Sequence, residues 1–120
     1  MVALCACLVL ACRQQGKSPD LTFAHDISPQ PPRVGKVTIT LNIKDTSGAP
    51  VSRARLNLEG NMSHAGMAAV FAETIEVEPG LYRTNMEFTM AGDWLLSVYV
   101  TLREGLHVDR QFEFKGVGPT

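Results

Sequence analysis

The chain has 120 residues, of which 45% are hydrophobic, so it is long enough for one domain with a sizeable core. Its net charge of −1 and its pI of about 6.3 indicate no basic surface for nucleic acid or for an anionic membrane. The three cysteines all lie within the first 12 residues, so the rest of the chain has neither a disulfide framework nor a catalytic thiol. These properties argue against nucleic-acid binding and against thiol chemistry in the folded part.

The first segment, Met1–Ala11, is an apolar run that is too short to span a bilayer, which needs about 20 residues. It is typical of the apolar region of a signal peptide. Val9-Leu10-Ala11-Cys12 resembles a bacterial lipobox, in which a cysteine that follows a small residue receives the lipid. We therefore predict a lipoprotein-type signal peptide over residues 1–11 and lipidation of Cys12. An ordinary cleaved signal peptide or a buried apolar start is the alternative.

Residues 12–20 are predicted to form the lipidated cysteine and a flexible tether, because Arg13–Asp20 is polar and contains Gly and Pro. The folded domain is predicted over residues 21–120. Its apolar residues alternate with a period of two rather than 3.6, most clearly over Val37–Lys44 and Trp94–Arg103. This period is typical of strands that bury one face.

About seven short strands are predicted, because turn-forming residues recur at intervals of about 8–12 and no stretch has a helical period. The pattern predicts an all-β fold, an antiparallel immunoglobulin-like β-sandwich. The predicted strands are Leu21–Ile27, Val37–Lys44, Arg53–Glu59, Val70–Val77, Tyr82–Phe88, Trp94–Arg103 and Leu106–Phe114.

The connection between the third and fourth predicted strands reads NMSHAGM over Asn61–Met67, and it holds two thioethers and one imidazole. Soft sulfur together with imidazole suits copper(I). Met62 and His64 are two residues apart and project to the same side of an extended segment, and Gly66 allows Met67 to turn back toward them. The stretch is expected to lie outside the alternating core pattern. We predict a copper(I) site here; the alternative is that the methionines fill gaps in the core and that the histidine is solvated.

Two further residues are candidate metal ligands. Met90 lies just beyond a predicted strand, at a sheet end where a ligand can project, and His25 lies on the first strand within reach of the same rim. Met86 shares its strand face with aromatic residues, which favours a place in the core. His107 has the outward parity of the last strand, which favours a surface position.

The chain contains no HExxH, no glycine-rich phosphate loop and no GxSxG, and no CxxC occurs within the domain. Asp and Glu residues are scattered singly along outward positions, so paired-carboxylate chemistry has no support. We therefore predict that the protein is not an enzyme and takes no small-molecule substrate.

Asn61–Met67, Gly80–Tyr82 and the FTMAGDW stretch Phe88–Trp94 together resemble the YtkA-like domain, which is related to FixH-type proteins. The resemblance covers roughly residues 34–100. It implies a small immunoglobulin-like sandwich outside the bacterial cytoplasmic membrane, either as a lipoprotein or fused to a membrane-fusion protein of a metal efflux system. FixH-type members are associated with cation-pump and oxidase assembly. The resemblance thus implies metal handling, with Met and His in the NMSHAGM stretch and a Met at the place of Met90.

Taken together, these features predict a lipid-anchored domain in the bacterial cell envelope that faces the periplasm or the cell exterior. It binds copper(I) and passes it, as a chaperone or buffer, to a metal-transport or oxidase-assembly protein. The alternative is a metal-free protein-interaction or adaptor module, in which Met62 and Met67 form an adaptable apolar contact patch.

Overall fold

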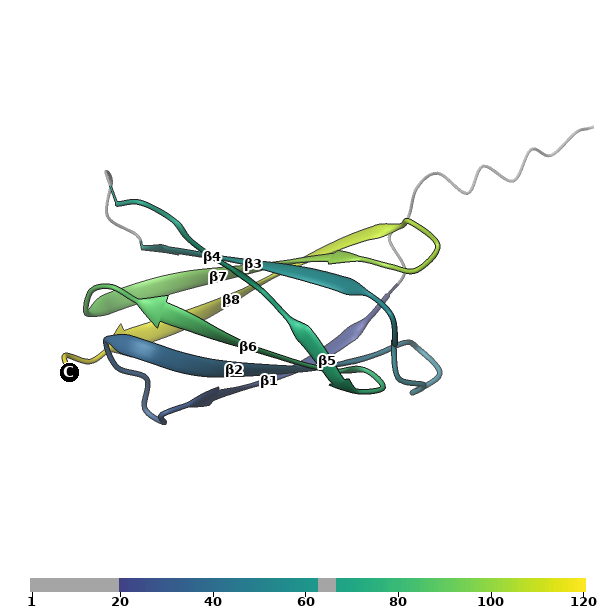
Figure 1. Ribbon diagram of the computed structural model, residues 1–120, viewed down its shortest axis with the longest axis horizontal. Helices are drawn as coiled ribbons and strands as arrows, with labels where there is room; N and C mark the ends of the chain where they lie inside the picture. The colour runs from purple at the N-terminus through teal and green to yellow at the C-terminus, as the bar shows by residue number, and fades with distance from the viewer. Residues whose placement is uncertain (1–19, 63–66) are drawn as a thin grey trace, which may run out of the picture.

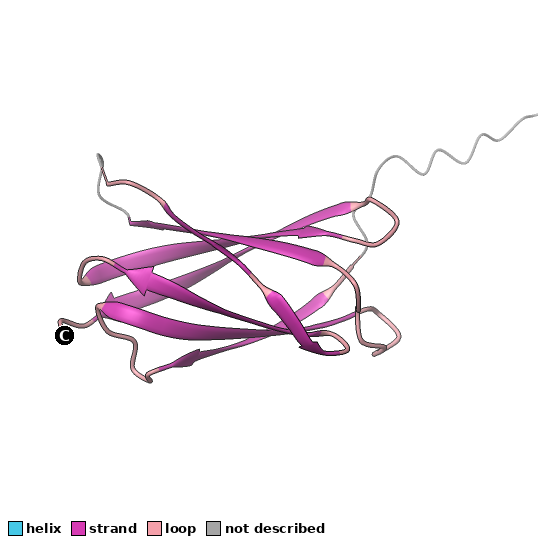
Figure 2. Cartoon of the chain, viewed as in Figure 1, coloured by secondary structure: helices cyan, strands magenta, loops and turns pink. Residues whose placement is uncertain are grey.

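The computed structural model describes residues 20–62 and 67–120, and all regular structure in these residues is β-strand (Figures 1 and 2). Two antiparallel four-stranded sheets, with strand orders β1-β2-β6-β5 and β4-β3-β7-β8, pack face to face. The predicted antiparallel immunoglobulin-like sandwich is confirmed, with eight strands in place of about seven. The strands are β1 (Thr22–Ser28), β2 (Gly35–Lys44), β3 (Arg55–Met62), β4 (Val70–Glu73), β5 (Ile75–Glu78), β6 (Leu81–Phe88), β7 (Gly92–Thr101) and β8 (His107–Val117).

The core lies between the two sheets and is built from alternate residues of the central strands. In β2 the buried and exposed residues alternate along the strand, as the period of two predicts. β7 follows the same rule, except that the outward-facing Ser97 is also buried. Each large apolar side chain that is fully buried contributes about 1.5–3 kcal/mol to the stability of the fold. The inner residues of β2, β3, β6 and β7 therefore hold the two sheets together.

The prediction of one strand over Val70–Val77 is wrong, because this stretch forms two strands in different sheets. β4 pairs with β3, whereas β5 pairs with β6. Thr74 lies between them, and its backbone N–H donates to the carbonyl of Leu56 at 3.2 Å. The hydroxyl of Thr84 on β6 donates to the carbonyl of Glu73 on β4 at 2.7 Å, which ties the sheets together beside the crossing. Both halves are edge strands and are only partly covered, so their alternation of buried and exposed residues is weak.

The connections between strands gather at the two ends of the sandwich (Figure 1). The β1–β2 and β6–β7 connections, the end of β3 and the C-terminus lie at one end. The start of β1, the β2–β3 connection and the β5–β6 and β7–β8 turns lie at the other. Within residues 20–62 and 67–120, no helix is long and apolar enough to cross a membrane.

Hydrogen bonds from β6 stabilise the end where β1 begins. Tyr82 is buried at the start of β6, where its hydroxyl donates to the carbonyl of Val51 at 2.7 Å and accepts from the backbone N–H of Ala54 at 3.1 Å. Burial raises the pKa of the Tyr82 phenol. Gly80 has a φ of +78°, and a Cβ there would lie 2.8 Å from the Cβ of Pro50. The Gly80-Leu81-Tyr82 motif is thus explained by close packing and hydrogen bonding in the scaffold.

Candidate metal site

Met62 is the last residue of β3, and its side chain points into the core. It is 9% exposed and continues the inward row that includes Leu58. Across the ladder it pairs with Trp94, and a Cβ on Gly92 would lie 2.9 Å from the Met62 Cε. The bare backbone of Gly92 therefore makes room for the methyl group of Met62. The expectation that the whole NMSHAGM stretch lies outside the core pattern is wrong for Met62, because β3 continues for three residues beyond the predicted end at Glu59.

Met67 lies between β3 and β4, where it is partly buried and packs against the core. His64 lies outside the described residues, in the segment 63–66 that joins Met62 to Met67. The predicted lipidation site, Cys12, also lies outside them. The structure thus places the two thioether residues of the predicted triad at the two ends of the same short segment.

Met90 lies in the connection between β6 and β7, at the same end of the sandwich as the end of β3 (Figure 1). Its side chain is 47% exposed, whereas its carbonyl accepts a hydrogen bond of 2.8 Å from the indole Nε1–H of Trp94. Trp94 is buried and stacks on Phe88, with 4.8 Å between the ring centroids. We call the end of the sandwich that carries Met62, Met67 and Met90 the methionine end.

Sequence reasoning did not assign Gly92 or Trp94 to the site. The available signal was the Met90-Ala91-Gly92-Asp93-Trp94 run itself, in which a turn glycine separates a methionine from an aromatic residue four positions on. Asp93 has a related structural role, because its carboxylate accepts a hydrogen bond of 2.9 Å from the backbone N–H of Gly116 near the end of β8. The Phe88–Trp94 part of the motif therefore shapes the methionine end.

A hollow of about 320 Å³ with mostly apolar walls reaches Met62 from the surface. Trp94 and the two acidic residues Asp93 and Glu113 are among the residues that line it. Met62 therefore borders this hollow, although its side chain is only 9% exposed. The lining residues are Asn61, Met62, Asp93, Trp94, Leu95 and Glu113.

The predictions for Met86 and His107 are confirmed. Met86 is 3% exposed in the core, and a Cβ on Gly60 would lie 3.2 Å from the Met86 Sδ and 3.4 Å from Cε3 of Trp94. Its sulfur and the indole thus occupy the space that Gly60 leaves open. His107 is exposed, and its Nδ1 lies 3.2 Å from the hydroxyl of Thr101.

The structure does not bring His25 to the methionine end. Its ring centroid lies 4.5 Å from that of Phe112 and 5.6 Å from that of Phe114, both on β8. Phe23 joins the same cluster, and the guanidinium of Arg110 lies 4.7 Å from its ring centroid. These side chains close the edge of the sandwich between β1 and β8, and β7 separates β8 from β3. The contacts of His25 are therefore those of a residue that closes an edge.

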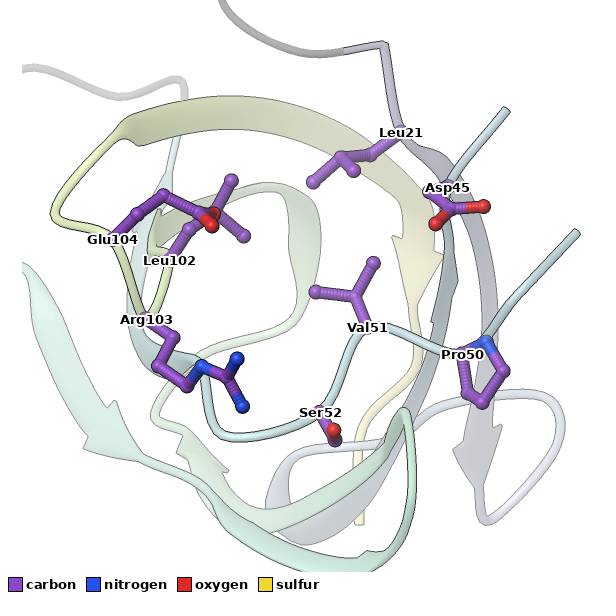
Figure 3. Close-up of a pocket in the computed structure, with 8 residues that line it drawn as sticks. All are labelled: Leu21, Asp45, Pro50, Val51, Ser52, Leu102, Arg103 and Glu104. Carbon is purple, nitrogen blue, oxygen red and sulfur yellow. The ribbon is translucent and has the colours of Figure 1, made fainter. Parts of the chain in front are cut away.

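A pocket of about 330 Å³ lies at the opposite end of the sandwich, where β1 begins (Figure 3). Leu21, Val51 and Leu102 line its interior. The carboxylate of Asp45 on its rim accepts hydrogen bonds from the hydroxyl and the backbone N–H of Ser47, at 2.6 and 2.9 Å. The hydroxyl of Ser47 is the main cause that lowers the pKa of Asp45. Asp45 thus serves the β2–β3 turn.

Carboxylate, imidazole and thiolate groups do not gather into a metal site in the described parts of the chain, since no three His, Cys, Asp or Glu side chains there are placed to hold an ion. The described residues of the methionine end that suit a metal ion are the methionines, whose thioether sulfur a soft ion such as copper(I) accepts. The donor chemistry of the methionine end fits that ion.

The YtkA-like family model matches residues 17–99. Among solved structures, the soluble domain of PmoD from Methylocystis sp. ATCC 49242 (Rockwell) is similar to this chain with a TM-score of 0.55 and 14% sequence identity, over 80% of this chain and 90% of that one. This likeness shows a shared fold. No functionally curated protein matches the sequence. Because the family match spans well over half of the chain, the protein belongs to the YtkA-like family.

Proposed function

We propose that this protein binds copper(I) as cargo at the methionine end and passes it to a partner in the bacterial cell envelope. Met62, His64 and Met67 are the proposed ligands, and Met90 completes the set. The observation that supports the proposal is that Met62, Met67 and Met90 lie at the same end of the sandwich, with Met90 in the connection that joins the two sheets. Thioether sulfur is the kind of soft donor that a soft metal ion prefers.

The chemistry of these donors suits an oxidising compartment. A thioether has no proton to lose and cannot form a disulfide, so its affinity for copper(I) changes little with pH. His64 is the one proposed ligand that must be neutral, and an unperturbed imidazole with a pKa of about 6.5 is largely neutral at pH 7. The cysteines are confined to the first 12 residues, which leaves the domain without a competing thiolate.

The burial of the methionines supports a route for transfer. Met62 is 9% exposed and held against Gly92, whereas Met90 is 47% exposed. A buried ligand retains the ion while an exposed ligand exchanges with a donor group of the partner. We propose a metal-transport or oxidase-assembly protein as this partner.

The placement of the N-terminal strand supports attachment through Cys12. β1 begins at the end of the sandwich opposite the methionine end (Figure 1). A lipid on Cys12 would therefore attach the protein to a membrane by the far end and leave the methionine end turned toward a partner. This is the arrangement expected of a domain that faces the periplasm or the cell exterior.

Competition for copper(I) against a chromophoric chelator tests the proposal, with residues 19–120 as the protein because they contain all eight strands. The test variant combines Met62→Leu, His64→Ala and Met67→Leu, since leucine nearly conserves the volume of methionine. Met86→Leu is the matched control, because it removes a buried thioether that is not a proposed ligand.

We expect one tight copper(I) site per chain in the parent protein and in the Met86→Leu control. We expect the affinity of the triple variant to fall by at least about tenfold, which corresponds to 1.4 kcal/mol. No binding by the parent protein, or equal binding by all three proteins, would contradict the proposed function.

An adaptor role without metal has one specific observation in its favour. Phe71 on β4 and Ile75 on β5 are each 72% exposed, and both strands lie at sheet edges. Exposed apolar side chains on an edge are typical of a protein-binding surface. His64→Ala separates the two functions, because it should weaken copper(I) binding and leave a contact through this edge unchanged.

A further inference from the structure

The turn between β6 and β7 combines an exposed side chain with a backbone that is held from within the core. Met90 is 47% exposed, yet its carbonyl accepts the indole N–H of Trp94 at 2.8 Å. Trp94 itself is 1% exposed. A buried indole N–H without an acceptor costs about 1–3 kcal/mol, so the carbonyl of Met90 cannot leave this position freely.

Trp94 is also held in a fixed position relative to Met62. The two residues are register partners in the β3–β7 ladder, and both line the same hollow. Stacking of Trp94 on Phe88, at 4.8 Å between centroids, prevents the indole from rotating away from the turn. One buried side chain thus joins the strand that carries Met62 to the turn that carries Met90.

We propose that Trp94 is a positioning residue of the copper(I) site, which holds the Met90 backbone so that the thioether of Met90 is presented beside Met62. This inference rests on the proposed function. Pre-organisation of a ligand lowers the entropy cost of metal binding, because the turn does not need to be ordered when the ion arrives.

A purely structural role for Trp94 predicts a different result from a positioning role. Trp94→Phe keeps an aromatic ring for the stack on Phe88 and removes the N–H that holds Met90. If Trp94 acts only in the core, this change lowers stability without altering the contribution of Met90 to copper(I) affinity. If it positions Met90, the two substitutions are coupled.

The experiment is a double-mutant cycle on copper(I) affinity with Trp94→Phe, Met90→Leu and the combined variant. Each single variant should bind about three- to tenfold more weakly, as the loss of one hydrogen bond or one weak ligand implies. The combined variant should be no weaker than Met90→Leu alone. Tyr82→Phe, which removes a buried hydroxyl at the opposite end, should leave the affinity unchanged.

A second measurement uses the metal-free protein, with methyl groups of methionine labelled for NMR. In Trp94→Phe the Met90 methyl signal should move toward its value in an unfolded chain, while the fold is retained. Additive effects in the cycle, or an unchanged Met90 signal in Trp94→Phe, would overturn the positioning role. Absence of copper(I) binding in the parent protein would instead refute the proposed function, and the NMR result would still decide whether Trp94 holds Met90.

Discussion

Replacement of Gly92 by alanine tests how tightly the methionine end is packed. Gly92 begins β7 with a φ of +132°, a backbone conformation that L-residues rarely adopt. The new Cβ would lie 2.9 Å from the Cε of Met62, whereas two carbon atoms pack best at about 3.5–4.0 Å. Gly92→Ala therefore introduces two separate sources of strain, one in the backbone and one against the side chain of Met62.

The two sources of strain differ in magnitude and in whether the surrounding structure can relieve them. Backbone strain at such a φ costs about 1–3 kcal/mol, and no change elsewhere relieves it. The methyl group of Met62 is the far end of a flexible side chain, so it can move at a cost of about 0.5–1.5 kcal/mol for a displaced rotamer. We therefore expect Gly92→Ala to lower the free energy of unfolding by about 2–4 kcal/mol.

The measurement is urea denaturation followed by the fluorescence of Trp94, the one tryptophan in the sequence. A second pair of proteins, Met62→Ala with and without Gly92→Ala, completes a double-mutant cycle. Because alanine at position 62 has no methyl group to displace, the cost of Gly92→Ala should fall by about 0.5–1.5 kcal/mol in that background. A loss below about 0.5 kcal/mol for Gly92→Ala alone, or the same loss in both backgrounds, would refute this account of the packing.

Two further predictions concern the opposite end of the sandwich. Tyr82→Phe should lower the free energy of unfolding by about 2 kcal/mol, because the carbonyl of Val51 and the N–H of Ala54 both lose a partner. Thermal denaturation should then show a fall in Tm of roughly 10 °C. An unchanged Tm would show that water replaces the hydroxyl. The pKa of Asp45 lies below its ordinary 3.8, chiefly because of the hydrogen bond from the Ser47 side chain. Ionised Asp45 therefore stabilises the fold above pH 3.8, and this contribution is lost as the pH falls through the lowered pKa. Asp45→Asn should therefore lower stability at pH 7 more than at pH 2 in urea titrations, and an equal loss at both pH values would contradict this assignment.

The central strands of the two sheets could be predicted because their alternation of apolar and polar residues is a local feature of the sequence. Val37, Ile39, Leu41 and Ile43 alternate with polar residues, and β2 has this alternation in the structure. The crossing at Thr74 could not be predicted, because nothing within Val70–Val77 shows which sheet each half joins. That choice depends on partners elsewhere in the chain, β3 for one half and β6 for the other.

The candidate site was predictable in composition and less so in geometry. The donor types at Met62, Met67 and Met90 are evident from the sequence, but the burial of Met62 depends on Gly92, which lies 30 positions further along the chain. His25 lies on the strand predicted for it and is exposed, and its neighbours follow from the strand orders, which put β1 at the edge of one sheet and β8 at the edge of the other. Periodicity reports which way a side chain faces and does not report what lies opposite.

The crossing at Thr74 has a mechanical consequence for the methionine end. β4 and β5 are one continuous length of chain that belongs to both sheets, so the sheets cannot slide past each other without breaking the β3–β4 or the β5–β6 ladder. Met62 is carried by one sheet, and the turn that carries Met90 joins that sheet to the other. Resistance to shear therefore keeps the end of β3, which carries Met62, at a constant spacing from the β6–β7 turn, which carries Met90.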